Sequence, residues 1–210
     1  MKNLIICGSG ELARETYHFL KNDDRYNFKG FLDFTYDDLK NYELYNFYLG
    51  NEDEYKFSNT DYLLICISDV NIKKRIYEKL KKRDINIINY FHKSVIFDTN
   101  TISLGEGNIF APYTIVSNNT IIGNCNFFNC FNSVGHDVNI GSFNTFSSHN
   151  DITGNVHIGD SNYFGSRVSV LPKAIIGNNN KISAGSVVYK KIGNNSIHHG
   201  NPTIKVGNNE

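Results

Sequence analysis

The sequence lacks an excess of either charge, any long apolar run and any tryptophan. Its 21 basic and 21 acidic residues cancel, so no net field attracts nucleic acid or an anionic membrane, and we expect neither as a partner. No apolar run approaches the roughly 20 residues that a membrane-spanning helix needs. With 15 Phe and 13 Tyr but no Trp, much of the apolar volume is aromatic, which names no function.

Cysteine is also scarce, and the four cysteines lie on strand-like or repeat segments without metal-ligand spacing: Cys7, Cys66, Cys125 and Cys130. We therefore expect reduced thiols in a cytoplasmic protein, and no metal site. The N-terminal segment MKNLIICGSG has too short an apolar part for a signal peptide and is bounded by glycine. It fits a first β-strand that runs into a turn.

Residues 1–94 follow an α/β pattern and form the first expected domain. An apolar run at 4–7 ends in Gly-Ser-Gly and leads into an amphipathic segment. Alternating strands and helices predict right-handed crossovers and a small, mostly parallel, Rossmann-like sheet that binds a nucleotide or nucleotide sugar. The further strands are expected near 28–33, 62–68 and 85–90, and the helices near 11–21 and 70–83.

A period of six residues replaces this pattern after about residue 95. Every sixth residue from Leu104 to Val188 is apolar, and the next residue is usually small. The fifteen positions are Leu104, Phe110, Val116, Ile122, Phe128, Val134, Ile140, Phe146, Ile152, Ile158, Phe164, Val170, Ile176, Ile182 and Val188.

A six-residue unit of this kind is one short strand and one turn. The apolar side chain points inward, and small or Asn residues accommodate the corner. Three units close a triangular coil, so residues 18 apart stack, at the strand spacing of roughly 4.8 Å. We predict a parallel β-helix of about five coils over 95–192, left-handed as in hexapeptide families, with a tail, 193–210, that packs over the last coil.

One histidine stands out within the repeat. His136 lies two residues after the inward Val134, hence near an outer corner, and Asp137 follows it. An imidazole beside a carboxylate keeps one nitrogen oriented and the other able to take a proton. Gly154 stacks on His136 one coil later, leaving open space and a backbone N–H that could stabilise an oxyanion.

The motifs of this chain resemble those of a known enzyme family. The glycine-rich α/β domain, the repeats GHDVNIG, TGNVHIG and FGSRVSVLPKAIIGNNNKISAGSVV, and the closing GNPTIKV resemble the sialic acid O-acetyltransferase and sugar-nucleotide N-acetyltransferase family. The resemblance implies an acetyl-CoA-dependent acetyltransferase that forms homotrimers, with its active site in the cleft between adjacent β-helices. The better-described members acetylate UDP-linked 4-amino-4,6-dideoxy sugars in bacterial glycan pathways.

The resemblance also implies roles for individual residues. His136 falls on the general base of the family, with Asp137 following it, and Gly154 falls on the glycine that contacts the thioester of acetyl-CoA. Many members carry a second histidine nine residues after the catalytic one, where this chain has Thr145, which still offers a hydroxyl to the cofactor cleft. The remaining coenzyme contacts fall on Ala184 and Gly185.

The glycines after the first strand have two interpretations. The segment GSGELA fits the relaxed dinucleotide fingerprint G-x-G-x-x-A, with an acidic residue at the end of the second strand. In the resembling family, this turn and the end of the second strand bind the nucleotide of the sugar substrate instead, as backbone N–H groups at a helix N-terminus suit a phosphate. The residues implied are Ser9, Gly10, Glu11, Asp33 and Phe34, of which Glu11 would repel a pyrophosphate unless it turns away.

The expected activity is N-acetylation of a nucleotide-linked 4-amino-4,6-dideoxy sugar in bacterial surface-glycan synthesis, with acetyl-CoA as the acetyl donor. O-acetylation of sialic acid or another sugar hydroxyl is an alternative, because both acceptors need only a base and a clear approach. A non-catalytic β-helix scaffold or nucleotide-sugar-binding protein is the alternative of another class. A zinc carbonic anhydrase, which uses three interface histidines, is disfavoured because His136, His149 and His157 lack that spacing.

Overall fold

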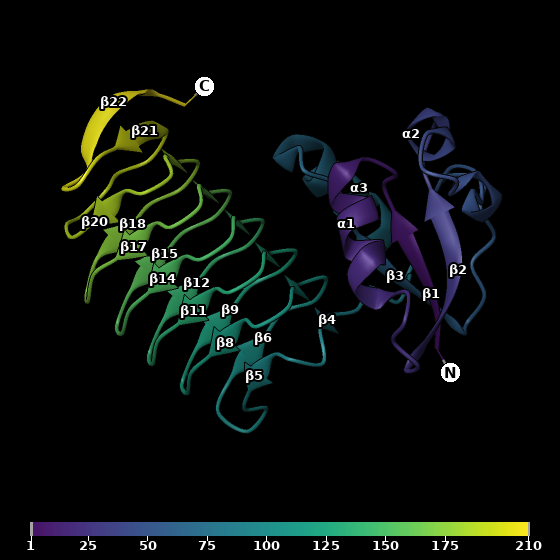
Figure 1. Ribbon diagram of the computed structural model, residues 1–210, viewed down its shortest axis with the longest axis horizontal. Helices are drawn as coiled ribbons and strands as arrows, with labels where there is room; N and C mark the ends of the chain where they lie inside the picture. Colours follow the sequence, from purple (N-terminus) through teal and green to yellow (C-terminus); the bar gives the residue numbers. More distant parts are fainter. Residues whose placement is uncertain (1, 210) are drawn as a thin grey trace. The chain divides into compact units, whose positions relative to one another are not determined.

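The computed structural model describes residues 2–209, which form two compact units that meet in the sequence between Tyr90 and Phe91 (Figure 1). The first unit is a parallel sheet of three strands in the order β2-β1-β3, so the first strand is central. The elements are β1 (Lys2–Cys7), α1 (Glu11–Leu20), β2 (Tyr26–Leu32), α2 (Asp37–Lys40), the 3₁₀ turn η1 (Tyr45–Phe47), β3 (Asp61–Ile65) and α3 (Val70–Lys81).

Helices α1 and α3 cover opposite faces of this sheet. Tyr17 of α1 packs its ring on Phe31 of β2, whereas Ile76 of α3 shares a core cluster with Leu32, the next residue of β2. Successive strand residues point to opposite faces, so the two helices lie on different sides. This is the doubly covered, Rossmann-like arrangement that the alternating pattern predicts.

One strand predicted in this unit is wrong. Within 85–89 the described chain contributes only an isolated bridge between Ile87 and Leu63. Leu63 donates its N–H to the Asn86 carbonyl, and its own carbonyl accepts the N–H of Ile88. In the described residues, this pairing does not extend into a ladder of several residues. The next regular element is β4 (Tyr90–Phe91), at the boundary of the two units.

The second unit is a parallel β-solenoid of about six coils built from three sheets (Figure 1). The β11 sheet contains β5 (Ile96–Phe97), β8 (Ile115–Val116), β11 (Ser133–Val134), β14 (Asp151–Ile152), β17 (Ser169–Val170) and β20 (Val187–Val188). The β12 sheet contains β6 (Ser103–Leu104), β9 (Ile121–Ile122), β12 (Asn139–Ile140), β15 (His157–Ile158) and β18 (Ile175–Ile176). The β13 sheet includes β7 (Ile109–Phe110), β10 (Phe127–Phe128), β13 (Thr145–Phe146), β16 (Tyr163–Phe164) and β19 (Lys181–Ile182), followed by the tail strands β21 (Ser196–His199) and β22 (Ile204–Asn208).

The six-residue period corresponds to the inward positions of these strands. Each of the fifteen predicted residues is the second residue of a strand, and all but Leu104 are buried. Residues 18 apart pair in parallel, for example Val134 with Ile152. The coil count exceeds the predicted five because β5 precedes the first position of the regular repeat.

Two ladders run along the inside of the solenoid. Four stacked phenylalanine pairs, from Phe91 to Phe164, have ring centroids 4.6–4.8 Å apart. Buried asparagines form the second ladder: Asn144, for example, donates its amide to Asn126 Oδ1 at 3.0 Å and to the Gly159 carbonyl at 2.9 Å. The same contacts recur at Asn126, Asn162 and Asn180. Together they fix the spacing between coils.

The corners agree only in part with the expectation that small or Asn residues accommodate them. From Leu104 to Ile182, the left-handed residue lies three positions after each inward residue. It is Asn at some corners, such as Asn119, but a larger or charged residue at others, such as Asp137 and Lys173. The small residue directly after the inward position serves close packing instead. A Cβ on Gly141 would lie 2.8 Å from the backbone of Gly159 in the next coil.

Candidate functional site

His136 lies at the corner between β11 and β12, anchored by two buried residues. Val134 and Val138 on either side are inward and 1–2% exposed, so the backbone of the corner is fixed. The His136 side chain itself is 57% exposed. The structure therefore presents this imidazole to solvent, where a ligand can reach it.

The imidazole is oriented by Asp137. Nδ1 of His136 lies 2.7 Å from Oδ2 of Asp137, and Asp137 occupies the left-handed region with φ +56°. The hydrogen bond from His136, reinforced by one from the Asn119 amide, lowers the pKa of Asp137 below its ordinary value. An ionised carboxylate at Nδ1 favours the tautomer that carries its proton on Nδ1 and leaves Nε2 as an acceptor.

Gly154 lies directly against the other side of this ring. A Cβ on Gly154 would be 2.6 Å from Nε2 and 2.8 Å from Cε1 of His136. Any side chain at this position would therefore occupy the space in front of the accepting nitrogen. The predicted stacking of Gly154 on His136 matches this contact.

The backbone N–H of Gly154 differs from its counterparts at another corner. Along the corner that follows the β12 sheet, each equivalent N–H donates to a side-chain oxygen one coil later, and these donors are Glu106, Asn124, Ser142, Asp160 and Asn178. Within residues 2–209, the Gly154 N–H donates no hydrogen bond, although its carbonyl accepts the Lys173 N–H. A donor thus stays available beside the imidazole, as a site for developing negative charge requires.

The other predicted coenzyme residues lie away from this corner. Thr145 is the first residue of β13 and is partly buried. Ala184 and Gly185 are exposed at the corner that follows β19, and a Cβ on Gly185 would meet nothing within 4 Å. The β11 sheet separates them from the corner of His136. One chain therefore brings together His136, Asp137 and Gly154, but not these three residues.

The predicted nucleotide residues meet at a second site, in the first unit. A cavity of about 250 Å³ opens at the carboxyl ends of β1, β2 and β3, where open α/β sheets bind ligands. Ser9 donates its hydroxyl to Asp33 Oδ2 at 2.7 Å, and Phe34 donates its N–H to Asp33 Oδ1 at 2.7 Å. Gly10 is the N-cap of α1, and Glu11 is its first residue and is exposed. Ser9, Gly10, Glu11 and Asp33 line the cavity; Phe34 is 66% exposed beside it.

Several residues around this cavity have no signal in the sequence pattern. Arg14 donates to the Ser9 carbonyl at 3.0 Å and lies 4.1 Å from the Tyr42 ring centre. Tyr48 donates its hydroxyl to the Asp33 carbonyl, and Asp38 lines the cavity. Arg14 belongs to α1, whereas Asp38, Tyr42 and Tyr48 come from the segment 34–50, whose fold depends on tertiary contacts.

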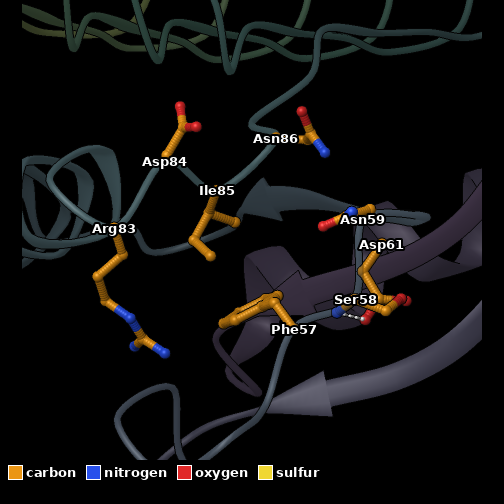
Figure 2. Close-up of a pocket in the computed structure, with 8 residues that line it drawn as sticks. All are labelled: Phe57, Ser58, Asn59, Asp61, Arg83, Asp84, Ile85 and Asn86. Carbon is orange, nitrogen blue, oxygen red and sulfur yellow. Dashed lines mark hydrogen bonds between the residues drawn. The ribbon is translucent and has the colours of Figure 1, made fainter.

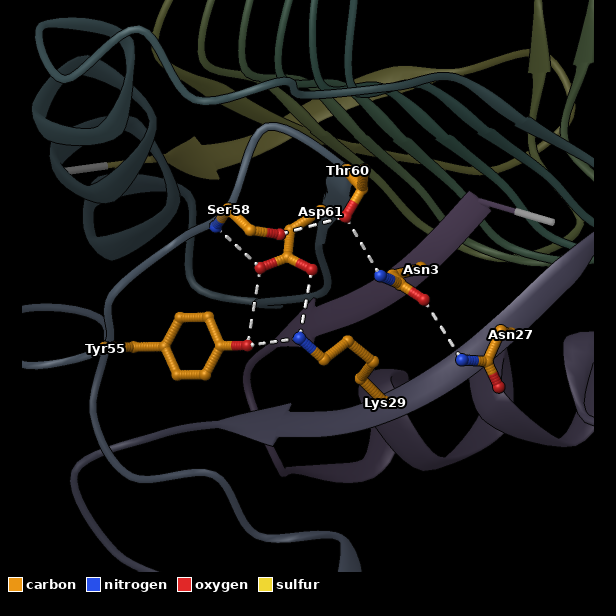
Figure 3. Close-up of polar contacts among 7 residues, drawn as sticks. All are labelled: Asn3, Asn27, Lys29, Tyr55, Ser58, Thr60 and Asp61. Carbon is orange, nitrogen blue, oxygen red and sulfur yellow. Dashed lines mark hydrogen bonds and ion pairs between the residues drawn. The ribbon is translucent and has the colours of Figure 1, made fainter.

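The opposite edge of the same sheet carries a polar network with a structural role. Figure 3 shows Lys29 donating to Tyr55 and Asp61, while Asn27 and Asn3 link β2 and β1 to Thr60. Burial alone would raise the pKa of Asp61, but hydrogen bonds from the Ser58 N–H and from Lys29 lower it. The network ties together the amino ends of the three strands.

A smaller cavity of about 120 Å³ lies near this edge (Figure 2). Arg83 beside it is held by the Glu52 and Tyr55 carbonyls. None of the predicted site residues lines it. Its lining is Phe57, Ser58, Asn59, Asp61, Arg83, Asp84, Ile85 and Asn86.

Among residues 2–209, no three His, Cys, Asp or Glu side chains lie close enough to hold a metal ion. Of the helices in the same residues, none combines the length and the apolar character needed to cross a lipid bilayer.

Comparison with known proteins identifies the repeat and the fold. Residues 155–190 match the bacterial transferase hexapeptide family (six repeats). Comparison of the sequence with curated proteins finds no match.

Three solved structures are similar over almost the whole chain. A variant of perosamine N-acetyltransferase from Caulobacter crescentus, in complex with CoA and GDP-perosamine, has a TM-score of 0.87 at 20% identity and covers 99% of this chain and 98% of its own. The acetyltransferase domain of PglB from Neisseria gonorrhoeae in complex with acetyl coenzyme A has a TM-score of 0.86 at 16% identity, covering 98% and 99%. WeeI from Acinetobacter baumannii has a TM-score of 0.81 at 21% identity, covering 98% and 100%. The chain thus carries hexapeptide transferase repeats and shares the fold of these three structures, among them a sugar N-acetyltransferase, as the resemblance of its motifs predicts.

Proposed function

We propose that this protein is an acetyl-CoA-dependent N-acetyltransferase that acts on a nucleotide-linked amino sugar. The observation that carries the proposal is the arrangement at one corner of the solenoid: Nδ1 of His136 is held 2.7 Å from Asp137, and Nε2 faces the space over Gly154. Perosamine N-acetyltransferase, which is bound to CoA and GDP-perosamine in its crystal structure, supports the assignment through its fold.

The three residues at this corner have distinct tasks. Acetyl-CoA supplies an acetyl thioester, whose C–S bond breaks as the sugar amine forms a C–N bond. His136 accepts the amine proton at Nε2, and Asp137 stabilises the resulting imidazolium through Nδ1. The Gly154 N–H is the donor available for the charge that develops on the carbonyl oxygen. The proton on His136 then serves the departing thiolate.

The residues available to the coenzyme fit a site shared between copies of the chain. Gly154 has no side chain, which lets the His136 ring pack against its backbone, and Gly185 leaves open space at its own corner. Thr145, Ala184 and Gly185 lie across the β11 sheet from His136, so one copy alone does not gather them. We propose a homotrimer in which one solenoid contributes the corner of His136 and the neighbouring solenoid contributes the other three residues to the same site. Light scattering after size-exclusion chromatography measures the mass of the assembly. A monomer that is fully active would contradict this arrangement.

The first unit supplies the proposed site for the nucleotide. Its cavity combines the exposed N-terminus of α1 with the Asp33 carboxylate, and the exposed ring of the next residue, Phe34, lies beside it. Backbone N–H groups at a helix N-terminus suit a pyrophosphate, and the carboxylate suits hydroxyl or N–H donors of the nucleoside. Such a substrate belongs to bacterial surface-glycan synthesis, and the 4-amino-4,6-dideoxy sugars are the acceptors to examine first.

The test is acetyl transfer from acetyl-CoA, followed by thiol release, to UDP-, dTDP- and GDP-linked 4-amino sugars beside free and CMP-linked sialic acid. Turnover on one amino sugar is expected, and His136→Ala should lower kcat/KM by about 10²–10⁴. His157→Ala is the matched control, because His157 is an exposed histidine of the solenoid on the outer face of β15. Transfer to sialic acids alone would replace N- by O-acetylation, and normal turnover in His136→Ala would refute the mechanism.

A further inference from the structure

The corner of His136 contains a third polar side chain, one coil earlier. Asn119 occupies the same left-handed position as Asp137, 18 residues before it, with φ +56° at both. Its amide Nδ2 donates to Asp137 Oδ1 at 3.3 Å, while Asp137 Oδ2 faces His136 Nδ1 at 2.7 Å. The two carboxylate oxygens are thus held from opposite sides.

The backbone keeps this line of groups in register. Asp137 donates its N–H to the Asn118 carbonyl at 3.1 Å, and Thr120, which follows Asn119, is buried and donates its hydroxyl to the Gly135 carbonyl. Asn is among the few residues that adopt the left-handed region readily. Asn119 therefore adopts the left-handed conformation that the corner requires, and its side chain also reaches Asp137 in the next coil.

We propose that Asn119 is a positioning residue that acts through Asp137 to orient the His136 imidazole. With the amide in place, the carboxylate presents Oδ2 to Nδ1 and the proton of the neutral ring stays on Nδ1. Without it, the exposed Asp137 side chain gains rotamers that do not meet the ring. The kinetic part of this inference rests on the proposed acetyl transfer, whereas the orientation of the ring does not.

No other charged side chain at this corner is placed to orient the His136 imidazole. At this corner the described residues one coil before and one coil after His136 are uncharged. Charged side chains next occur two coils away, at Asp98 on one side and at Lys173 on the other. On its own corner, Asp137 is the one ionisable neighbour within hydrogen-bond distance. The residues that flank it in the stack are Asn118, Asn119, Gly154 and Asn155.

The variants that test this role replace Asn119, whose backbone is left-handed. Asn119→Gly removes the amide without backbone strain, because glycine populates this region freely. Asn119→Asp keeps the shape but places a second carboxylate beside Asp137. The control is Asn179→Gly, since Asn179 has φ +55° and donates to Asn195 one coil later at 2.9 Å, at a different corner.

The decisive measurement is the ¹⁵N chemical shifts of the histidine ring nitrogens, with the His136 signals identified by their loss in His136→Gln. We expect the Nδ1–H tautomer in the unmodified protein and a tautomer mixture in Asn119→Gly and in Asn119→Asp, since neither variant offers the amide donor to Asp137. Asn179→Gly should match the unmodified protein. An unchanged tautomer in both Asn119 variants would overturn the proposal.

Kinetics provide the second readout. Asn119→Gly should lower kcat about three- to tenfold, the net value of one typical intramolecular hydrogen bond, with KM for acetyl-CoA unchanged. If the unmodified protein transfers acetyl to no acceptor, the proposed function fails, and the nuclear magnetic resonance measurement of the tautomer still decides the role of Asn119.

Discussion

Gly154→Ala tests whether the space in front of the imidazole is essential. The new Cβ would lie 2.6, 2.8 and 3.2 Å from Nε2, Cε1 and Cδ2 of His136. The ring must retreat by about 0.8 Å to reach a van der Waals separation near 3.4 Å. The imidazole ends a flexible side chain, so it moves while the backbone stays in place.

The retreat has a calculable consequence for activity. The hydrogen bond of 2.7 Å between His136 and Asp137 weakens as the ring turns away, and Nε2 leaves the position from which it would accept the proton. A misplacement of about 1 Å in a catalytic group costs on the order of 10² in rate. We therefore expect Gly154→Ala to lower kcat/KM between about 10- and 100-fold.

The stability of Gly154→Ala should not fall with its activity. Gly154 is not among the glycines with positive φ, so alanine fits its backbone and restricts the unfolded chain, a gain of about 0.4–1 kcal/mol. Activity should thus fall while Tm holds or rises. Gly193→Ala is the control, because a Cβ there meets nothing within 4 Å and its φ is not positive; it should leave activity unchanged and give the same small gain in stability. Full kcat/KM in Gly154→Ala would refute the assignment of this space to the reaction.

Three predictions concern stability. Phe128→Ala removes the ring stacked at 4.8 and 4.6 Å between its two neighbours and should cost about 3–5 kcal/mol in urea unfolding; a loss below about 1 kcal/mol would contradict a packed ladder. Asn144→Ala leaves buried partners of its amide unpaired, at about 1–3 kcal/mol each, so Tm should drop by several degrees, and an unchanged Tm would argue against the ladder. Burial, and then the charge of Lys205, lower the pKa of His198 below 6.5, so its contribution to stability is complete above pH 6.5 and is lost as the pH falls through the folded-state pKa. The slope of Tm between pH 7.5 and 5 should flatten in His198→Gln, and an equal slope would exclude this histidine as the cause.

The solenoid was predictable because its period is encoded residue by residue. An inward position must be apolar in every unit, and 18 residues fix the stacking partner, so the contact of Gly154 with His136 followed from arithmetic. The same arithmetic places Asn119 beneath Asp137, but Asn is so frequent at these corners that the pattern alone gives it no distinct signal. Only the distance from its amide to the carboxylate separates it from the other asparagines.

The first unit was less predictable because its details depend on tertiary contacts. The segment 85–90 has the composition of a strand, yet only Ile87 finds a bridge, to Leu63. Arg14 is a surface position on a helix by its periodicity, and its role beside Ser9 arises because the loop 34–50 folds over it. Long loops of this kind carry no periodic signal.

The rigidity of the solenoid explains why its corners can hold chemistry. The phenylalanine and asparagine ladders hold the coils about 4.7 Å apart, and buried residues such as Val134 and Val138 fix both ends of each corner. Side chains from three successive coils then meet at distances set by the interior, although each is exposed. Asn119, Asp137 with His136, and Gly154 occupy three such coils, so a repeat that serves folding also sets the geometry of the site.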